Sequence, residues 1–304
     1  MTAHNFNDNV ADTHYLLDDQ SPLPKPSPRV VKENKILDLF SLKGKVCVVT
    51  GSGHGIGLAV AEGYAQAGGD VVFWDLQAPE KEALKIAQEN GVKTKAYAGD
   101  VTDAVRVDEI IADIENEFGT IDVFVANAGV NIVSGTIINE ANADGELWKK
   151  VMDINLNGVF YCSRAVGKVF KKHGKGSLIF TGSMSAHIVN LPVYHSAYNA
   201  SKAAVVHLAK CLALEFHDFA RVNAISPGYC DSGINDYLDK KTRQRWWSLI
   251  PMGREGLCKE CVVLICTSLV MLQLTLLVLN WLLMVLTLLF DLSQIFVFNV
   301  HVLL

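Results

Sequence analysis

The chain has 304 residues, a formal net charge of −5 and 50% hydrophobic residues. This length accommodates one α/β domain of about 250 residues with tails at its ends. An acidic balance without a cluster of Lys and Arg excludes the electrostatic footprint of a nucleic-acid-binding protein. Seven cysteines, an odd number and mostly isolated, indicate a reducing compartment, and we expect a cytoplasmic protein.

Residues 1–36 differ in composition from the rest of the chain. They carry scattered aspartates and then the proline-rich run Ser21–Pro28. Such a segment cannot bury enough apolar surface to fold, so we expect a disordered tail. It has no apolar stretch typical of a signal peptide, and its acidic residues argue against a transit peptide.

Residues 37–260 show the pattern of one Rossmann-type, doubly wound parallel sheet, because short β-branched runs alternate with Ala-rich helical stretches. We expect strands, each short and apolar as in a sheet covered on both faces, at residues 45–50, 70–75, 94–98, 121–127, 177–181 and 221–226. The intervening helices are expected at residues 56–67, 80–90, 103–118, 146–172 and 197–219. No internal repeat and no second domain are visible.

A glycine-rich turn joins the first strand to the first helix, in the sequence Thr50-Gly-Ser-Gly-His-Gly-Ile-Gly57. Gly51 permits a tight turn, Gly55 permits close approach of a pyrophosphate, and Gly57 permits the helix to pack closely on the strand. The N–H groups of the helix start attract phosphate. The turn therefore predicts a dinucleotide site that includes Gly51, His54, Gly55, Ile56 and Gly57.

Asp75 ends the next strand, where a carboxylate accepts hydrogen bonds from the adenosine ribose 2′-OH. A carboxylate at this point repels a 2′-phosphate, and His54 before Gly55 offers no permanent cation to one. The cofactor is therefore expected to be NAD or NADP, with Asp75 favouring NAD. The alternative is that Asp75 is a solvated loop residue after a strand.

Tyr198 and Lys202 lie one helical turn apart on the same face of the helix expected at residues 197–219. A nearby ammonium stabilises a phenolate and so lowers the tyrosine pKa from about 10 toward the range useful for proton transfer. Alone this pair is a weak signal, because Tyr and Lys at this spacing arise by chance in many helices. Together with the glycine turn it is specific.

These motifs resemble those of the short-chain dehydrogenase/reductase family, over residues 40–258. Within the family the chain is similar to the fungal sorbose reductase and carbonyl reductase (polyol dehydrogenase) group, in the stretches 37–45, 183–190 and 250–256. The residues that carry the family resemblance fall in the family's order: Thr50, Gly51, Gly55, Gly57, Asp100, Val101, Asn127, Ala128, Gly129, Asn155, Ser183, Tyr198, Lys202, Pro227 and Gly228.

The resemblance implies a catalytic role for four residues. Tyr198 would be the general acid in ketone reduction and the base in alcohol oxidation. Lys202 would lower the pKa of Tyr198 and hold the nicotinamide ribose. Ser183 would hydrogen-bond the substrate oxygen, and Asn155 would help to hold a water that relays protons to Lys202.

The resemblance also implies further cofactor contacts. Asp100 would meet the adenine amine and Val101 would pack by the ring. The remaining contacts, along the cofactor and at its nicotinamide end, would come from Asn127, Ala128, Gly129, Pro227, Gly228 and Ser232. A small-molecule substrate, no metal and a homo-oligomer (tetramer or dimer) are likewise implied.

Two serines compete for the substrate-binding role. Most of the family places this serine thirteen residues before the tyrosine, which selects Ser185. The strand at 177–181, however, delivers Ser183 to its C-terminal end, where such sites lie. We therefore select Ser183, with Ser185 as the alternative. Two further candidates, His187 and the pair Trp246 and Trp247, could touch substrate or simply be a loop histidine and packing residues.

The resemblance ends near Cys261, where the family continues with an amphipathic helix and a last strand. Here residues 261–304 are apolar, and the 22 residues Leu269–Phe290 carry no charge, which makes them a candidate membrane span. A slip of reading frame fits better, because a shifted frame with suitable synonymous codons can restore a family-like ending. On that interpretation the tail is aberrant, the final strand of the sheet is missing, and membrane association is not expected.

The sequence thus predicts an oxidoreductase that moves a hydride between a nicotinamide cofactor and a secondary alcohol or ketone, with polyol and ketose as the expected pair. Two alternatives remain open. One is a non-catalytic or inactive dinucleotide-binding protein, since a fold alone does not establish chemistry. The other is a membrane-anchored reductase, if residues 261–304 are genuine.

Overall fold

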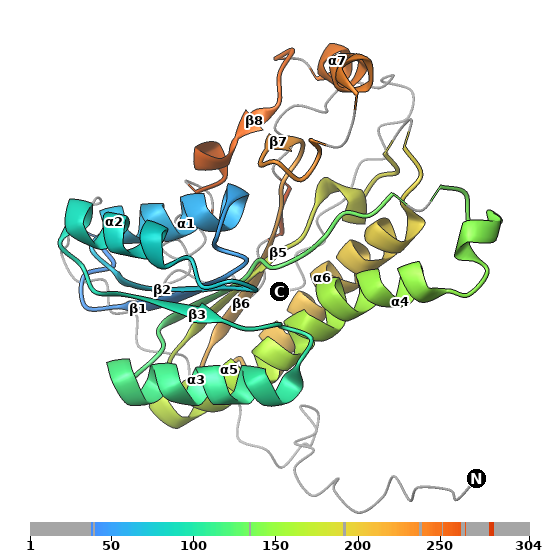
Figure 1. The fold of residues 1–304 in the computed structure, drawn as a ribbon. Helices are drawn as coiled ribbons and strands as arrows, with labels where there is room; N and C mark the ends of the chain where they lie inside the picture. The colour runs from blue at the N-terminus through green and yellow to red at the C-terminus, as the bar shows by residue number, and fades with distance from the viewer. Residues whose placement is uncertain are drawn as a thin grey trace, which may run out of the picture. The chain divides into compact units, whose positions relative to one another are not determined.

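The computed structural model in Figure 1 describes most of the chain that follows the N-terminal segment. The described residues are 38, 40–133, 135–190, 193–236, 239–250, 252–262, 265 and 280–282. The chain divides into two units, Met1–Lys35 and Ile36–Leu304, and every described residue belongs to the second. The tail expected at residues 1–36 therefore lies outside the described residues.

A seven-stranded parallel sheet forms the centre of the domain, with the strand order β3-β2-β1-β4-β5-β6-β9. Its strands are β1 (Val46–Thr50), β2 (Asp70–Asp75), β3 (Thr94–Ala98), β4 (Val123–Ala126), β5 (Ser177–Thr181), β6 (Arg221–Ser226) and β9 (Asn280–Leu282). The order reverses between β1 and β4, which makes this the topological switch point where ligands of such sheets bind. The expected doubly wound sheet is confirmed.

Helices cover both faces of the sheet (Figure 1). The helices are α1 (Gly55–Gln66), α2 (Glu80–Asn90), α3 (Ala104–Phe118), α4 (Glu146–Met152), α5 (Gly158–His173), α6 (Ser196–Glu215) and α7 (Lys240–Leu249). Buried side chains of α1 and α2 pack on one face, and those of α3, α5 and α6 pack on the other. Two short strands outside this sheet, β7 (Cys230–Asp231) and β8 (Gly256–Leu257), pair with each other.

Strand β1 illustrates why the strands at the centre of the sheet are apolar. Val46 and Val48 belong to the core on the α3/α5/α6 face, whereas Cys47 and Val49 belong to the core on the α1/α2 face. Successive side chains of a strand point to opposite faces, so a strand covered on both sides needs apolar residues at every position.

The helix expected at residues 146–172 is interrupted. Helix α4 is followed by a π-helical turn at Asp153–Asn157, and α5 starts only after it. Asn155 lies in this turn and is fully buried. Such turns insert a residue into a helix and redirect side chains, frequently at functional sites. Periodicity alone does not reveal the interruption.

One expectation about the sheet needs correction. The final strand was expected to be missing, yet the three residues Asn280–Leu282 form β9 and pair in parallel with Ala224–Ser226 of β6. Parallel pairing uses backbone N–H and C=O groups, which a segment unrelated in side chains also provides. The free edge of β6 is therefore partly covered, over three residues only.

No helix in the described part of the chain is long and apolar enough to cross a membrane. The candidate span Leu269–Phe290 lies outside the described residues, apart from β9.

Candidate active site

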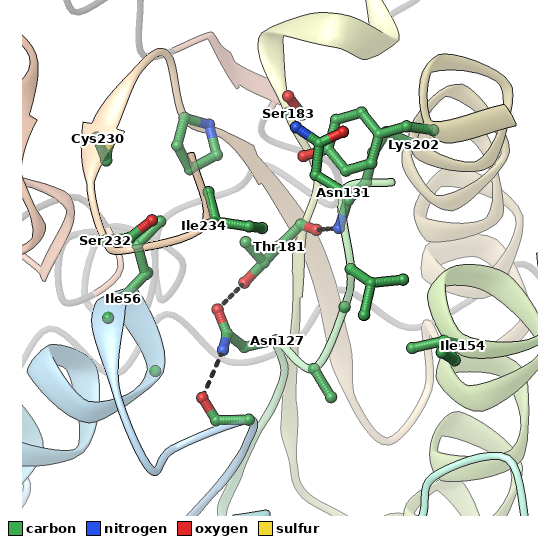
Figure 2. A pocket seen from close by; sticks show the side chains of 18 of the residues that line it. Ile56, Asn127, Asn131, Ile154, Thr181, Ser183, Lys202, Cys230, Ser232 and Ile234 are labelled. Carbon is green, nitrogen blue, oxygen red and sulfur yellow. Dashed lines mark hydrogen bonds between the residues drawn. The ribbon is translucent and has the colours of Figure 1, made fainter. Parts of the chain in front are cut away.

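A cavity of about 540 Å³ opens at the carboxyl ends of the strands. Residues that directly follow β1, β2, β4, β5 and β6 line it, and Figure 2 shows its walls. Of the residues expected to bind cofactor or substrate, all but Asn155 line this cavity: Gly51, His54, Gly55, Ile56, Gly57, Asp75, Asp100, Val101, Asn127, Ala128, Gly129, Ser183, Tyr198, Lys202, Pro227, Gly228 and Ser232.

The glycine turn has no room for side chains. Gly51 has φ +65°, and a Cβ there would lie 2.8 Å from the Ala128 Cα. A Cβ on Gly57 would lie 2.0 Å from the Gly51 carbonyl oxygen, and one on Gly55 would lie 2.8 Å from the Ser232 carbonyl oxygen. The backbone is thus bare where α1 begins, which is the shape and polarity that suit a pyrophosphate. The residues present therefore fit a dinucleotide.

The side chain of Asp75 is hydrogen-bonded to the backbone of the glycine turn. Its Oδ2 accepts a hydrogen bond from the Gly53 amide at 2.8 Å, and its Oδ1 accepts one from the Leu76 amide at 2.7 Å. Asp100 lies further along the wall and accepts hydrogen bonds from the amide and hydroxyl of Thr102 at 2.9 and 2.8 Å. Both carboxylates are therefore held by local backbone in the part of the cavity that would take an adenosine.

Asn127 ties three strand ends together, as the dashed lines in Figure 2 show in part. Its Nδ2 donates to the carbonyl oxygens of Thr50 and Gly51 at 3.0 and 3.1 Å. Its Oδ1 accepts from the Thr181 hydroxyl at 3.1 Å. The ends of β1, β4 and β5 are thus linked through one side chain, which fixes the floor of the cavity.

Lys202 is almost completely buried on α6, and its Nζ donates to the Thr181 carbonyl oxygen at 2.8 Å. Burial lowers the pKa of Lys202 to about 8, because removal from water disfavours the charged ammonium. The Nζ lies 5.8 Å from the centre of the Tyr198 ring. Helix α6 thus brings the two side chains together at the cavity, as the spacing predicted.

Asn155 stands behind the cavity wall. Its Oδ1 accepts from the Val130 amide at 2.8 Å, and its Nδ2 donates to the Val130 carbonyl oxygen and to the Ser201 hydroxyl at 2.9 and 3.1 Å. A Cβ on Gly129 would lie 3.2 Å from the Asn155 Oδ1 and 3.4 Å from the Lys202 Nζ. Asn155 and Lys202 therefore flank the same glycine.

Both candidate serines line the cavity, and their hydrogen bonds differ. Ser183 follows β5, and its Oγ accepts from the Ser185 amide at 3.1 Å. The Ser185 hydroxyl instead donates to the Asn190 Oδ1 at 2.7 Å. The proton of Ser185 is thus committed within the protein, whereas the Ser183 hydroxyl faces the cavity beside Lys202 and Asn131 (Figure 2).

The three remaining candidates for substrate contact differ in their positions relative to the cavity. His187 does not line the cavity, and its Nε2 lies 3.0 Å from the Ser226 hydroxyl. Trp246 lines the cavity and stacks on the Tyr229 ring at a centroid distance of 4.2 Å. Trp247 faces a different surface depression, next to Arg243.

Several polar lining residues were missed by sequence reasoning: Asn131, Asn190, His195, Tyr229 and Asn235. His195 had an available signal, because it precedes Tyr198 by three residues and so lies near it at the start of α6. The others lie in loops, whose conformation the sequence pattern does not predict.

Comparison with known proteins agrees with this geometry. Residues 51–270 match the short-chain dehydrogenase model described as enoyl-(acyl carrier protein) reductase. The chain belongs to the short-chain dehydrogenase/reductase family. It is an NAD(P)-dependent oxidoreductase that transfers hydride between a nicotinamide cofactor and a carbon bearing an alcohol or ketone oxygen.

Three similar proteins are particularly informative. A probable NADP-dependent mannitol dehydrogenase of Yarrowia lipolytica is 50% identical over 237 residues, which cover 78% of this chain and 84% of the relative. A sorbose reductase of Candida albicans is 51% identical over 243 residues, covering 79% and 85%. The crystal structure of NADPH-dependent 3-quinuclidinone reductase from Rhodotorula rubra is 39% identical, with a TM-score of 0.78 and coverage of 85% and 96%.

Proposed function

We propose that this protein interconverts a ketose and the corresponding polyol. Two relatives that are 50% and 51% identical over the aligned residues are named probable NADP-dependent mannitol dehydrogenase and sorbose reductase, and mannitol is a polyol and sorbose a ketose. The polar lining of the cavity near Tyr198, with several asparagine side chains and a histidine, suits a substrate with many hydroxyl groups.

The observation that carries the proposal is the cluster of Tyr198, Lys202 and Ser183 at the carboxyl ends of the strands. A bound nicotinamide would supply the hydride for ketose reduction, and Tyr198 would give its phenolic proton to the ketone oxygen. Ser183 would donate a hydrogen bond to the same oxygen. Lys202, held by the Thr181 carbonyl, would stabilise the phenolate that remains on Tyr198.

Asn155 would act one step further from the substrate. Its side chain fixes the backbone at Val130 and contacts Ser201, whose hydroxyl donates to the Tyr198 carbonyl oxygen at 2.7 Å. It would thereby hold the Gly129 region open for a water between Asn155 and Lys202. Protons released or consumed at Lys202 would pass through this water.

The proposal is tested by following NADH or NADPH oxidation with L-sorbose and D-fructose, and by identifying the alditol formed. Saturable consumption of cofactor with formation of the matching alditol supports it. Consumption with simple ketones but with neither ketose would reject the substrate class while leaving the oxidoreductase assignment in place.

For the cofactor, we infer a preference for NAD(H) over NADP(H), unlike the relatives whose names specify NADP. The support is Asp75, whose carboxylate lines the cavity and is fixed by two backbone amides. A 2′-phosphate beside this carboxylate would be opposed by about 1 kcal/mol or more, which is about fivefold or more in affinity. Comparison of kcat/KM for both cofactors tests this, and Asp75→Ser should move the ratio toward NADPH.

We also propose a cytoplasmic, homo-oligomeric enzyme. The support for the compartment is the set of free thiols, Cys162 and Cys211 among them, in the described part of the chain. The support for an oligomer is the family resemblance. Size-exclusion chromatography with light scattering measures the oligomeric state.

For residues 261–304 we propose a shift of reading frame. The support is the uncharged, Leu-rich sequence that replaces the family's ending, together with a family match that stops at residue 270. Exposed apolar surface of this size favours aggregation. Expression of the given and the frame-restored genes side by side tests the proposal. If the uncorrected gene instead yields an active protein that is extracted only with detergent, residues 261–304 act as a membrane anchor. If only the protein from the frame-restored gene is soluble, that protein is used for the assays of the active site.

A further inference from the structure

The part of the cavity near Tyr198 contains a histidine whose polar atoms have no partner. His195 is 4% exposed, and neither ring nitrogen has a hydrogen-bond partner among the described residues. Its ring nevertheless lines the cavity and lies 5.6 Å from the Tyr198 ring, centre to centre. A buried polar group without a hydrogen-bond partner is energetically unfavourable.

The position of this imidazole is fixed by the helix that carries the reacting tyrosine. His195 immediately precedes α6, and its carbonyl oxygen accepts a hydrogen bond from the Asn199 amide at 3.0 Å. The side chain does not cap the helix. The ring therefore lies next to Tyr198 without capping α6.

The protonation state of His195 suits recognition of a hydroxyl. Burial lowers the pKa of His195, so the imidazole is neutral near pH 7. A neutral imidazole has one N–H donor and one nitrogen acceptor, and a hydroxyl group can pair with either. A ring nitrogen of His195 could therefore pair with one hydroxyl group of the substrate.

Asn131 presents a second unpartnered atom at the same cavity. Its Oδ1 is buried and has no hydrogen-bond partner among the described residues, while its Nδ2 makes only a long contact of 3.5 Å with the Asn235 Oδ1. Asn131 lines the same cavity as Ser183 and Lys202, and Figure 2 labels all three. The Asn131 Oδ1 could therefore accept a hydrogen bond from a second hydroxyl group of the substrate.

We propose that His195 and Asn131 bind hydroxyl groups of the substrate and thereby determine specificity for polyhydroxylated ketones over simple ones. The inference rests on the proposed ketose reductase function. A site whose buried polar groups hydrogen-bond the hydroxyl groups of a substrate discriminates strongly against a molecule without hydroxyl groups. Such a molecule displaces water but leaves the polar groups of the site unpaired. Neither residue takes part in the proton transfer assigned to Tyr198.

The test compares two substrates in matched variants. Wild type, His195→Phe, His195→Gln and Asn131→Leu are assayed with D-fructose and with 2-hexanone, which has the same carbon count but no hydroxyl. His195→Phe and Asn131→Leu should each lower kcat/KM for fructose by about tenfold or more, mainly through KM. Activity on 2-hexanone should stay within about threefold, and His195→Gln, which keeps a donor and an acceptor, should recover most of the fructose activity.

His207, exposed on the same helix, provides the control: His207→Phe should leave both substrates unchanged. Binding of NADH, followed by its fluorescence, verifies that each variant is folded. Equal losses on the two ketones, or no loss on fructose, would overturn the inference while the ketose reductase function stands. If His195→Phe fails to bind NADH, the inference is judged from Asn131→Leu, by its ratio of kcat/KM for D-fructose to kcat/KM for 2-hexanone. A wild type inactive on fructose rejects the proposed function and this inference together.

Discussion

The two ends of the cavity differ in how their polar groups are satisfied. At the dinucleotide end, Asn127 and Asp75 have hydrogen-bond partners within the protein on both polar atoms of each side chain. At the end near Tyr198, His195 and the Oδ1 of Asn131 have none among the described residues. The first end is built as part of the scaffold, whereas the second presents polar atoms with which a substrate can pair.

The largest effect is expected from Tyr198→Phe. The variant keeps the ring but removes the phenolic proton, so turnover should fall by about 10²–10⁴-fold. Because the dinucleotide end is unchanged, the dissociation constant for NADH should stay within about twofold. Stopped-flow turnover and a fluorescence titration give the two values.

Two outcomes would argue against this role of Tyr198. One is turnover that survives the substitution. The other is a parallel loss of NADH binding, which would mean that Tyr198 supports the scaffold rather than the reaction.

The next effect separates the two serines. Ser183→Ala removes the hydroxyl that faces the cavity and should lower kcat about 10²-fold. Ser185→Ala removes a bond to Asn190 and should reduce kcat less than tenfold, with a small loss of thermal stability. Rate measurements on both variants decide, and the reverse order would assign the substrate-binding role to Ser185.

The third effect concerns stability and compares the two ends directly. Asn127→Ala leaves the Gly51 carbonyl and the Thr181 hydroxyl without their partner, so unfolding should become easier by about 2–4 kcal/mol. His195→Phe removes two unpartnered nitrogens and should leave the free energy of unfolding unchanged or raise it. Chemical denaturation of the cofactor-free variants measures both, and a loss in His195→Phe as large as that in Asn127→Ala would remove the distinction.

The smallest effect is a dependence of stability on pH that originates at Lys202. Its pKa is about 8 in the folded protein and about 10.5 when unfolded, so the unfolded state binds more protons between these values. Stability from this group therefore rises as pH increases through that window, by about 1 kcal/mol between pH 7.5 and 9. Lys202→Met should lack this rise when the two denaturation series are compared.

Much of the fold was predictable from local patterns. Strands β1 and β4 are buried at every position, and the ends of the expected strands coincide with the observed ones within two residues. Gly51 follows β1 and Asp75 ends β2, which marks where these strands stop. The glycine turn and the Tyr198/Lys202 spacing indicated the cavity, since both depend only on backbone geometry within one turn. These are the parts in which sequence neighbours are also spatial neighbours.

Other parts could not be read from the sequence. The π-helical turn at Asp153–Asn157 depends on the contact of Asn155 with Val130, which lies 25 residues earlier. Whether Ser183 or Ser185 has its proton free depends on Asn190, a loop residue. The pairing of Asn280–Leu282 with β6 involves a segment that no family pattern covers. In the first and last of these cases a contact distant in the sequence accompanies the local structure, and in the second the conformation of the loop decides.

Transfer of deuterium addresses the proposed reaction directly. NADH carrying deuterium at the transferable C4 position is incubated with the protein and D-fructose, and the alditol product is examined by mass spectrometry. We expect an alditol that is one mass unit heavier, with the deuterium on the newly formed carbinol carbon. The absence of alditol, or an alditol without deuterium, would contradict hydride transfer to a ketose at this site.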